Sequence, residues 1–218
     1  MIVIDYNSKK HKEIIHAAVL ALTHGKAVVF PTDTSYGLAV DATNAKAVKK
    51  LYAIKGRGFN KPVHVIVPSQ KYCKQLVLWD AKAQKLAKAF WPGALTLVLS
   101  LKSKNTSIKA VSAKTGYIGL RYPDNTIALD LAKKLGRPIT ATSANISGGM
   151  DSYSIADIYK NFKYSKQKPD IVLNAGKLRK KMPSTLLKIT DTGYEILRKG
   201  PVTEKQITKI LHARKTLL

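Results

Sequence analysis

The sequence predicts an α/β protein with a single domain and a twisted, mixed sheet flanked by helices. Short apolar runs of strand length alternate with longer stretches whose apolar residues recur at helical spacing. Glycine and proline separate many of these segments. The chain has 218 residues, 45% of them hydrophobic, which is enough for a core and too apolar for disorder. We see neither internal repeats nor a linker, so we predict one domain over residues 1–218.

The first half of the chain begins with a helix. From about Ser8 to His24 the apolar residues lie on one stripe, and Gly25 follows, the residue type that most often ends a helix. The other elements predicted in this half are a strand over 27–30, a helix over 45–54, a strand over 63–67, and helices over 69–77 and 80–90, the last capped by Asp80.

The second half adds mostly strands. We predict strands over 95–101 and 117–120, a helix over 125–135 stopped by Gly136, and strands over 138–141, 171–173, 185–189 and 195–197. Thr203 and Gln206 form a capping-box pattern that opens a last helix. Residues 150–170 and 174–183 are polar, and we predict that they are mobile connections.

Charge is the dominant bulk property. Lys and Arg number 38 and Asp and Glu 13, so the formal net charge is +25. The surplus can serve solubility alone, or it can attract a polyanion such as a nucleic acid. Because the lysines are scattered along the whole chain, both interpretations stay open. The scarcity of carboxylates argues against a carboxylate-rich magnesium cage and a paired-carboxylate hydrolase.

Several common classes of site lack their residues. One cysteine, Cys73, can form neither an intramolecular disulfide nor a cysteine-based zinc site, and we expect it to be packed and inert. Neither a Gly-x-x-x-x-Gly-Lys-Ser/Thr loop nor Gly-x-Gly-x-x-Gly occurs. Spacing leaves a Ser-His-Asp triad open, without a Gly-x-Ser-x-Gly elbow to support it. No apolar segment reaches the ~20 residues of a membrane span, and no signal peptide is evident, so we expect a cytoplasmic protein.

A polar stretch follows the predicted strand over 27–30. Residues 31–38, PTDTSYGL, fit a turn, because turns use Pro, Asp, Ser and Gly. They also fit the rim of a binding site, because α/β folds place ligands at strand carboxyl ends. The other unusual stretches are KGRGFNKP (55–62), WPGALTLVL (91–99), IGLRYPD (118–124), TATSANISGG (140–149), PSTLL (183–187) and ILRKG (196–200). Singly, each is typical of ordinary helix ends and turns. Together they offer cations for phosphates, hydroxyls for a small polar ligand and glycines for close approach, so we favour a rim that serves phosphoryl-type transfer.

In their order along the chain, these motifs resemble those of the YrdC-like threonylcarbamoyl-AMP synthases, from about residue 10 to 210. The resemblance implies a twisted mixed sheet with a large, positively charged concave groove. It implies a nucleotidyltransferase that makes threonylcarbamoyl-AMP and pyrophosphate from L-threonine, bicarbonate and ATP. The product would serve threonylcarbamoyladenosine modification of tRNA, through downstream transfer proteins.

The resemblance also implies roles for individual residues. The catalytic residues would be Lys55, Arg57, Ser143 and Asn145. The ATP-binding residues would be Arg57, Lys61, Tyr117, Ala141, Ser143 and Arg198, with Lys55 adding positive charge near the phosphates. The L-threonine-binding residues would be Thr34, Arg121 and Ser184, where Arg121 pairs with the threonine carboxylate. Mg²⁺ would arrive with ATP, without a metal site of the protein.

The chain departs from the family pattern at four positions. Thr142, Gly58 and Ala94 stand where proline is common, and Ile66 stands where longer relatives have a histidine near threonine. We expect the first three to loosen loops rather than remove contacts.

Two other functions compete with the synthase. One is an RNA-binding module, for tRNA or rRNA, that uses the positive charge without catalysis. The other is the carbamoyl-transfer variant of hydrogenase maturation, whose zinc-binding cysteines and acylphosphatase-like region are missing from this sequence. The pairs Lys55/Arg57 and Ser143/Asn145 favour the synthase, because a mere binder needs charge but not that small polar set.

Overall fold

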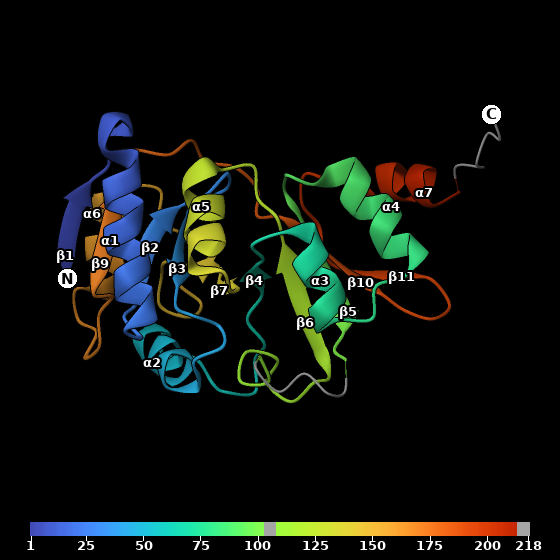
Figure 1. Ribbon diagram of the computed structural model, residues 1–218, viewed down its shortest axis with the longest axis horizontal. Helices are drawn as coiled ribbons and strands as arrows, with labels where there is room; N and C mark the ends of the chain where they lie inside the picture. The colour runs from blue at the N-terminus through green and yellow to red at the C-terminus, as the bar shows by residue number, and fades with distance from the viewer. Residues whose placement is uncertain (103–107, 213–218) are drawn as a thin grey trace.

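The computed structural model describes residues 1–102 and 108–212, and it confirms the mixed α/β class. The strands form two sheets rather than the one sheet predicted (Figure 1). Strand-length patterns along a sequence carry no information about which strands pair, so the number of sheets was beyond the prediction.

The first sheet has the strand order β1-β9-β2-β3-β8. Pairing is parallel from β1 through β9 to β2, and antiparallel from β2 through β3 to β8. Its strands are β1 (Ile2–Asp5), β2 (Val28–Pro31), β3 (Tyr36–Ala39), β8 (Thr142–Ser143) and β9 (Ile171–Asn174).

The second sheet has the order β11-β10-β5-β6-β4-β7 and is also mixed. Its strands are β4 (Val65–Ile66), β5 (Leu95–Ser100), β6 (Tyr117–Arg121), β7 (Ile139–Thr140), β10 (Thr185–Ile189) and β11 (Tyr194–Arg198).

Apart from α6, which was not predicted, the helices begin and end close to the predicted residues. They are η1 (Ser8–Lys10), α1 (His11–Thr23), α2 (Ala45–Lys55), α3 (Gln70–Leu76), α4 (Ala81–Phe90), α5 (Thr126–Leu135), α6 (Ile155–Phe162) and α7 (Glu204–His212). Asp80 caps α4 by accepting from the Ala83 amide at 2.7 Å. The Gln206 side chain accepts from the Thr203 amide at 2.9 Å, which confirms the capping box before α7.

The prediction of a mobile connection over 150–170 is wrong, because α6 lies inside it. Ser154 caps this helix through the Asp157 amide. Ile155, Ile158 and Phe162 recur at spacings of three and four and form the face that packs on the core. These three large apolar residues, in a segment of only eight residues, are a weak signal for a helix in the sequence. Strands β1, β3 and β8, which were not predicted, are likewise short.

Different helices cover the two sheets, and α5 contacts a strand of each. α1 and α5 lie side by side over the first sheet, and α4 and α7 lie together beside the second (Figure 1). The sheets meet through β7, where the Thr140 hydroxyl donates to the Leu38 carbonyl at 3.1 Å and accepts from the Val40 amide at 2.9 Å. Ile139 also forms an isolated bridge with Asp41. These bonds hold β3 of one sheet against the edge of the other.

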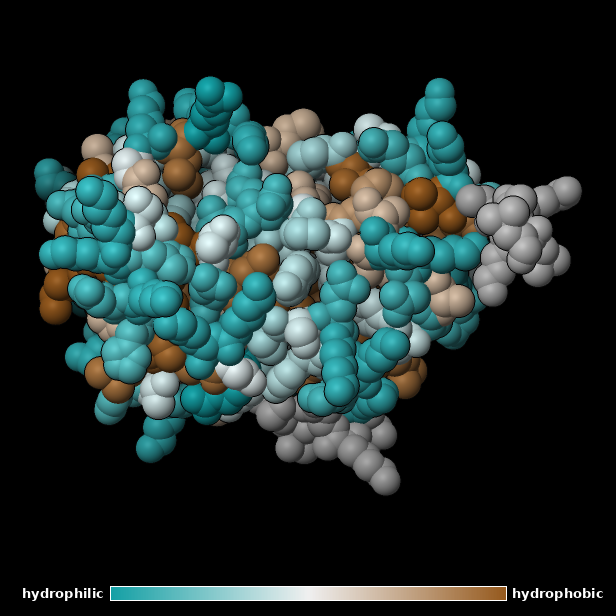
Figure 2. Space-filling view, turned by 45° about the horizontal axis from the view of Figure 1, so that its top comes forward, coloured by the Kyte–Doolittle hydropathy of each residue, from teal (hydrophilic) through white to brown (hydrophobic). Residues whose placement is uncertain are grey.

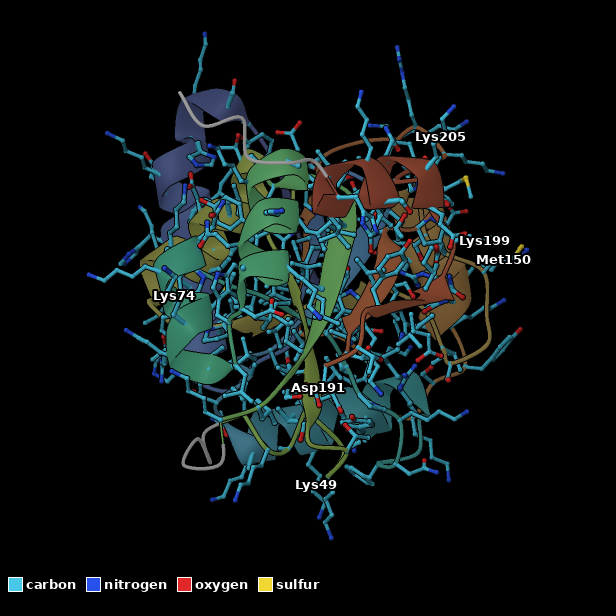
Figure 3. The ribbon with its side chains drawn as sticks, turned by 90° about the vertical axis from the view of Figure 1, so that its right-hand side faces the viewer. Lys49, Lys74, Met150, Asp191, Lys199 and Lys205 are labelled. Carbon is cyan, nitrogen blue, oxygen red and sulfur yellow. The ribbon has the colours of Figure 1, made fainter. Side chains whose placement is uncertain are left out.

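The surface is strongly hydrophilic in the view of Figure 2. Figure 3 shows Lys49, Lys74, Lys199 and Lys205 projecting outward from different parts of the fold. Within residues 1–102 and 108–212, no helix combines the length and the apolar character that crossing a membrane requires.

Candidate active site

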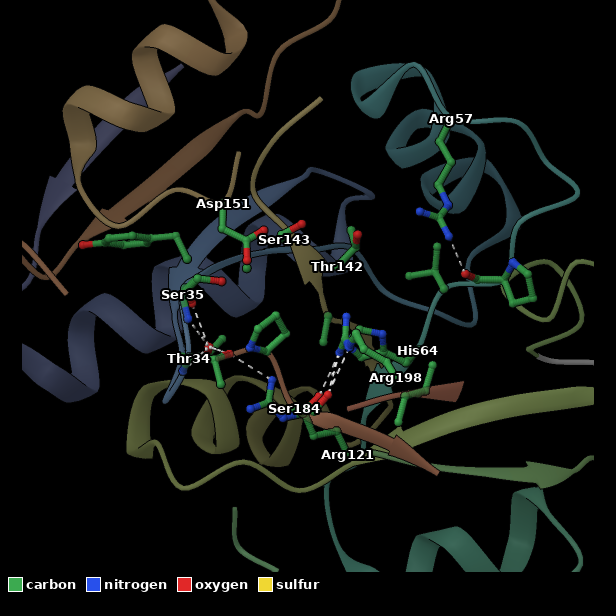
Figure 4. A pocket seen from close by; sticks show the side chains of 18 residues that line it. Thr34, Ser35, Arg57, His64, Arg121, Thr142, Ser143, Asp151, Ser184 and Arg198 are labelled. Carbon is green, nitrogen blue, oxygen red and sulfur yellow. Dashed lines mark hydrogen bonds between the residues drawn. The ribbon is translucent and has the colours of Figure 1, made fainter. Parts of the chain in front are cut away.

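A pocket of about 240 Å³ lies where the two sheets meet. Residues on both sheets and their loops line it (Figure 4). They are Thr32, Thr34, Ser35, Tyr36, Gly37, Arg57, Pro62, Val63, His64, Arg121, Ala141, Thr142, Ser143, Asp151, Pro183, Ser184, Leu186 and Arg198. The pocket therefore gathers stretches from six of the seven polar motifs, which are far apart in the sequence.

The stretch after Pro31 is both a turn and a rim. β2 and β3 form an antiparallel hairpin in which Pro31 pairs with Tyr36. The Thr32 amide donates to the Ser35 carbonyl at 3.1 Å, and the Thr32 hydroxyl accepts from the Thr34 amide at 3.1 Å. A Cβ on Gly37 would lie 3.0 Å from the Phe30 ring, so glycine allows the hairpin to close this tightly. The turn leaves the side chains of Thr32, Thr34 and Ser35 on the pocket wall.

Arg121 lies at the end of β6 and is almost completely buried. Its Nη2 donates to Asp33 Oδ1 at 2.7 Å, and its Nη1 donates to the Thr34 hydroxyl at 3.3 Å. Its Nε is buried without a partner among the described residues. Burial lowers the pKa of Arg121, and the Asp33 carboxylate opposes that shift. A buried guanidinium with unused hydrogens is a natural partner for a ligand carboxylate.

Ser184 and Arg198 form a second polar group on the pocket wall. Arg198 Nη2 donates to the Ser184 carbonyl at 2.9 Å and to its hydroxyl at 3.2 Å. The same hydroxyl lies 2.8 Å from Thr96 Oγ1 on β5. A Cβ on Gly200 would overlap the Pro183 carbonyl oxygen and the Thr185 amide nitrogen. Glycine at 200 therefore lets the chain after β11 lie against the chain before β10.

Arg57 and His64 line the pocket from the loop between α2 and β4. Arg57 Nη2 donates to the Pro62 carbonyl at 3.0 Å, which folds this loop back on itself. His64 was not predicted as a site residue. Burial lowers the pKa of His64 to about 3, and the nearby charges of Arg121, Arg198 and Arg57 act in the same direction. The imidazole is therefore neutral at physiological pH.

Lys55, the last residue of α2, is 1% exposed. Its Nζ donates to the Ser143 carbonyl at 2.7 Å, the Asn145 carbonyl at 2.9 Å and Asn145 Oδ1 at 2.9 Å. Burial and Arg57 lower the pKa of Lys55 to about 7, while Asp151 acts in the opposite direction. The structure thus joins the two predicted catalytic pairs directly, but neither Lys55 nor Asn145 lines the pocket.

Two predicted nucleotide contacts lie outside this pocket. Lys61 is exposed, and its carbonyl accepts from the Tyr52 hydroxyl at 2.8 Å. Tyr117 begins β6, at the opposite end from Arg121, with Lys188 Nζ 4.2 Å from its ring centroid. The other four residues predicted to bind ATP line the pocket: Arg57, Ala141, Ser143 and Arg198.

Asp151 is the one carboxylate among the residues that line the pocket. It precedes α6 and makes no hydrogen bond or ion pair to the other described residues. Within the described part of the chain, no group of three or more His, Cys, Asp or Glu could hold a metal ion. This donor set fits a Mg²⁺ ion held mainly by phosphates and water, with Asp151 as the available protein oxygen.

Positions that depart from the family pattern also have defined places. Ile66, where longer relatives have a histidine, lies on β4 of the second sheet and is fully buried in a hydrophobic cluster with residues of α1, α5 and β2. Thr142 lines the pocket, whereas Ala94 lines a neighbouring hollow that shares Thr32 and Thr34 with it. Cys73 is buried in α3, and burial raises its pKa to about 12, which agrees with the expectation of an inert thiol.

The fold and the pocket define an α/β protein whose site is built from arginines and small hydroxyl residues, suited to small anionic ligands. The Sua5/YciO/YrdC family model, described as "Telomere recombination", matches residues 20–200. The chain belongs to this family.

Three relatives illustrate the similarity. A Methanocaldococcus jannaschii protein is 34% identical over 205 residues, 94% of each chain. The threonylcarbamoyl-AMP synthase of Bacillus subtilis is 34% identical over 210 residues, 96% of this chain and 59% of the relative. The structure of P. abyssi Sua5 complexed with L-threonine is 31% identical, with a TM-score of 0.86, over 97% of this chain and 60% of that one. The chain therefore spans about three fifths of the last two relatives.

Proposed function

We propose that this protein is an L-threonylcarbamoyladenylate synthase that forms threonylcarbamoyl-AMP and pyrophosphate from L-threonine, bicarbonate and ATP. The convergence of Arg57, Arg121 and Arg198 on one pocket with Ser143 and Ser184 is the observation that carries the proposal. The name of the Bacillus subtilis relative and the L-threonine bound to the P. abyssi relative support it.

L-threonine would bind beside Arg121 and the turn between β2 and β3. Arg121 holds Asp33 and Thr34 with one hydrogen each from Nη2 and Nη1, which leaves further N–H groups for the threonine carboxylate. Thr34 supplies a hydroxyl group beside that guanidinium, and Ser184 supplies a second hydroxyl group on the same pocket wall. Asp33 keeps the buried arginine paired with a carboxylate in the absence of substrate, and this limits the cost of burying its charge.

ATP would bind with its phosphates toward Arg57 and Arg198. The threonine amine captures bicarbonate as a carbamate with loss of water, and a carbamate oxygen then attacks the α-phosphorus while pyrophosphate leaves. Two anions must approach each other, so the guanidinium groups lower their repulsion and hold the line of attack. Mg²⁺ bound to the phosphates would neutralise further charge, with Asp151 facing it from the pocket wall.

Pyrophosphate release from ATP tests the proposal directly. It should require both L-threonine and bicarbonate, and mass spectrometry should detect threonylcarbamoyl-AMP in the same reaction. Omission of either co-substrate is the matched control. Release that is independent of threonine, or no release under any condition, would contradict the synthase.

RNA contact is a second candidate function, supported by a basic hollow away from the pocket. This hollow of about 530 Å³ is lined by Lys46, Lys49, Lys50, Ala53, Gln167 and Lys168. Lys50 is paired with Asp170 at 2.6 Å, whereas the ammonium groups of the other three lysines have no ion-pair partner in the described part of the chain. We propose that tRNA or another RNA contacts this surface in the cytoplasm, before transfer proteins use the adenylate. RNA binding without pyrophosphate release would favour a binding module, and the affinity should fall steeply with salt.

A further inference from the structure

Lys55 has no hydrogen left for a substrate in this structure. A protonated lysine side chain carries three N–H groups. All three have an acceptor within 2.9 Å, and all three acceptors belong to Ser143 or Asn145. Arg57, two residues further along, faces the pocket instead. The two residues of the Lys-x-Arg motif therefore have different surroundings.

The segment that Lys55 holds is a network of short bonds. The Ser147 amide donates to the Lys55 carbonyl at 2.8 Å, which adds a main-chain link. The Ser143 hydroxyl donates to Asn145 Oδ1 at 2.8 Å, the same oxygen that accepts from Lys55. The Asn145 amide group donates in turn to the Gly149 carbonyl at 2.6 Å. Lys55 is thus the point where the end of α2 and residues 143–149 are joined.

We propose that Lys55 is a positioning residue, whose ammonium group sets the place of the Ser143 hydroxyl on the pocket wall rather than binding phosphate. The inference deepens the proposed function and rests on it for the catalytic consequence. Ser143 Oγ uses its hydrogen on Asn145 Oδ1, and Asn145 Oδ1 is in turn fixed by Lys55. The lysine therefore acts on the pocket through Asn145.

Protonation of Lys55 controls how completely the three acceptors are satisfied. A neutral amine has two N–H groups, and its lone pair would point at a carbonyl oxygen. The charged groups that face Lys55 are Arg57, from the loop after α2, and Asp151, from the loop before α6. Because the pKa of Lys55 is lowered to about 7, the fully bonded form should decline above neutral pH in the ligand-free protein.

Hydrogen–deuterium exchange of the ligand-free protein tests the positioning role without any assay of activity. Lys55→Met keeps the unbranched part of the side chain, without the terminal nitrogen, and so removes its donors. We expect amide exchange in residues 144–149 to rise about tenfold or more, because their local opening loses three bonds. Lys49→Met, an exposed lysine on the same helix, is the matched control and should leave exchange in this segment unchanged. Unchanged exchange in folded Lys55→Met would overturn the inference.

A pH series on the wild-type protein covers the case in which Lys55→Met does not fold. After correction for intrinsic exchange, residues 144–149 should be less protected at about pH 8.5 than at about pH 6, with peptides from α1 as the reference. Equal protection at both pH values would contradict the role assigned to the ammonium group.

Kinetics separate positioning from phosphate contact. For Lys55→Met we expect kcat to fall about 100-fold, with the Kd for ATP changed by about fivefold or less. A loss of ATP affinity as large as the loss of kcat/KM would identify a direct phosphate contact and overturn the inference. If the wild-type protein makes no adenylate, the proposed function fails, and the exchange measurements still decide whether Lys55 holds the segment.

Discussion

Each arginine on the pocket wall is already held by an acceptor of the protein. Arg57 bonds to the Pro62 carbonyl, Arg121 to Asp33, and Arg198 to the Ser184 carbonyl. These bonds fix the guanidinium groups before a substrate arrives. Groups that are oriented in advance need no reorganisation when charge develops, which is the main source of electrostatic catalysis.

Replacing Arg57, which is only partly buried, tests whether a guanidinium group oriented in advance contributes to catalysis. Arg57→Ala should lower kcat/KM for ATP by about 100- to 1,000-fold, the effect of losing one preorganised charge donor. The melting temperature should change little, because the lost bonds join Arg57 to its own loop. Steady-state pyrophosphate release and thermal melts measure the two effects, with Lys88→Ala, at an exposed lysine on α4, as the control. Normal turnover would refute the role of Arg57.

The lowered pKa of His64 predicts how the free energy of unfolding depends on pH. Its folded pKa of about 3 lies below the ordinary value of 6.5, so the unfolded chain binds the proton more strongly. Stability contributed by neutral His64 is present above pH 6.5 and is lost as the pH falls toward 3. The free energy of unfolding should fall by at most about 1.4 kcal/mol per pH unit in this range. Partial exposure of the His64 side chain should reduce this slope.

Urea unfolding at several pH values measures this slope. His64→Gln should remove part of the loss between about pH 6 and pH 4. His16→Gln, on α1 and away from the pocket, is the control. Identical pH dependence in the wild type and His64→Gln would show that this histidine is not the responsible group.

The sequence motifs predicted many of the residues that line the pocket. They did not predict single polar residues that lie between or beside the motifs. Thr34, Arg57, Arg121, Ser184 and Arg198 were predicted and do line the pocket. Asp151 lies two residues after the end of the motif 140–149, and His64 stands in an apolar run next to a β-strand. Neither has a spacing that marks it. Their placement comes from loop geometry and from close approach of chains, as at Gly119, where a Cβ would lie 2.8 Å from the His64 Cβ.

At the scale of elements, the long helices and strands were predictable and the shortest were not. Helices α4 and α5 have apolar faces and side-chain N-caps, Asp80 and Asn125, which the sequence displays. α1 has an apolar face and is followed by Gly25, although no side chain caps its start. β8 has only two residues, too few for any period, and its register with β3 is set by partners about 100 positions away. The place of Thr142 in β8 is thus a matter of sheet pairing that local patterns do not contain.

The hairpin of β10 and β11 gives a prediction about the second polar group. Gly200→Ala should push the end of β11 away from Ser184, because the new Cβ would overlap backbone atoms that cannot move aside. We expect a loss of about 1–3 kcal/mol in the free energy of unfolding, together with weaker ATP binding through displaced Arg198. Urea unfolding and calorimetric titration measure both effects.

Gly193→Ala is the matched control for this substitution. Gly193 lies in the turn of the same hairpin, and nothing lies within 4 Å of a Cβ built there. It should leave ATP affinity unchanged. Equal effects of the two substitutions would show that the fit at Gly200 does not position Arg198.

At the scale of the whole molecule, the site depends on both sheets at once. Thr34 and Ser143 come from the first sheet, and Arg121 and Arg198 come from the second. The sequence predicted the α/β class but not this division, because apolar patterns do not record which strands share a sheet. The junction at Thr140 and Asp41 is therefore as important for the pocket as the motifs.

We propose that the two sheets unfold together as one domain. The Thr140 bonds to Leu38 and Val40, and the packing of α5 against both β2 and β4, support this. Urea unfolding followed by tryptophan fluorescence, from Trp79 and Trp91 near the second sheet, should coincide with far-ultraviolet circular dichroism of the whole chain. Two separated transitions would contradict a single cooperative unit.

Strand β1 has a consequence for how the protein is made. Ile2 pairs with Ile171, and Asp5 pairs with Asn174, so β1 pairs with a strand that lies 169 residues further along the chain. During synthesis on the ribosome, the first sheet cannot close until residues 171–174 have emerged, and contacts of such separation slow folding. Until then the nascent segment has an unpaired strand, open to chaperones and to wrong pairing.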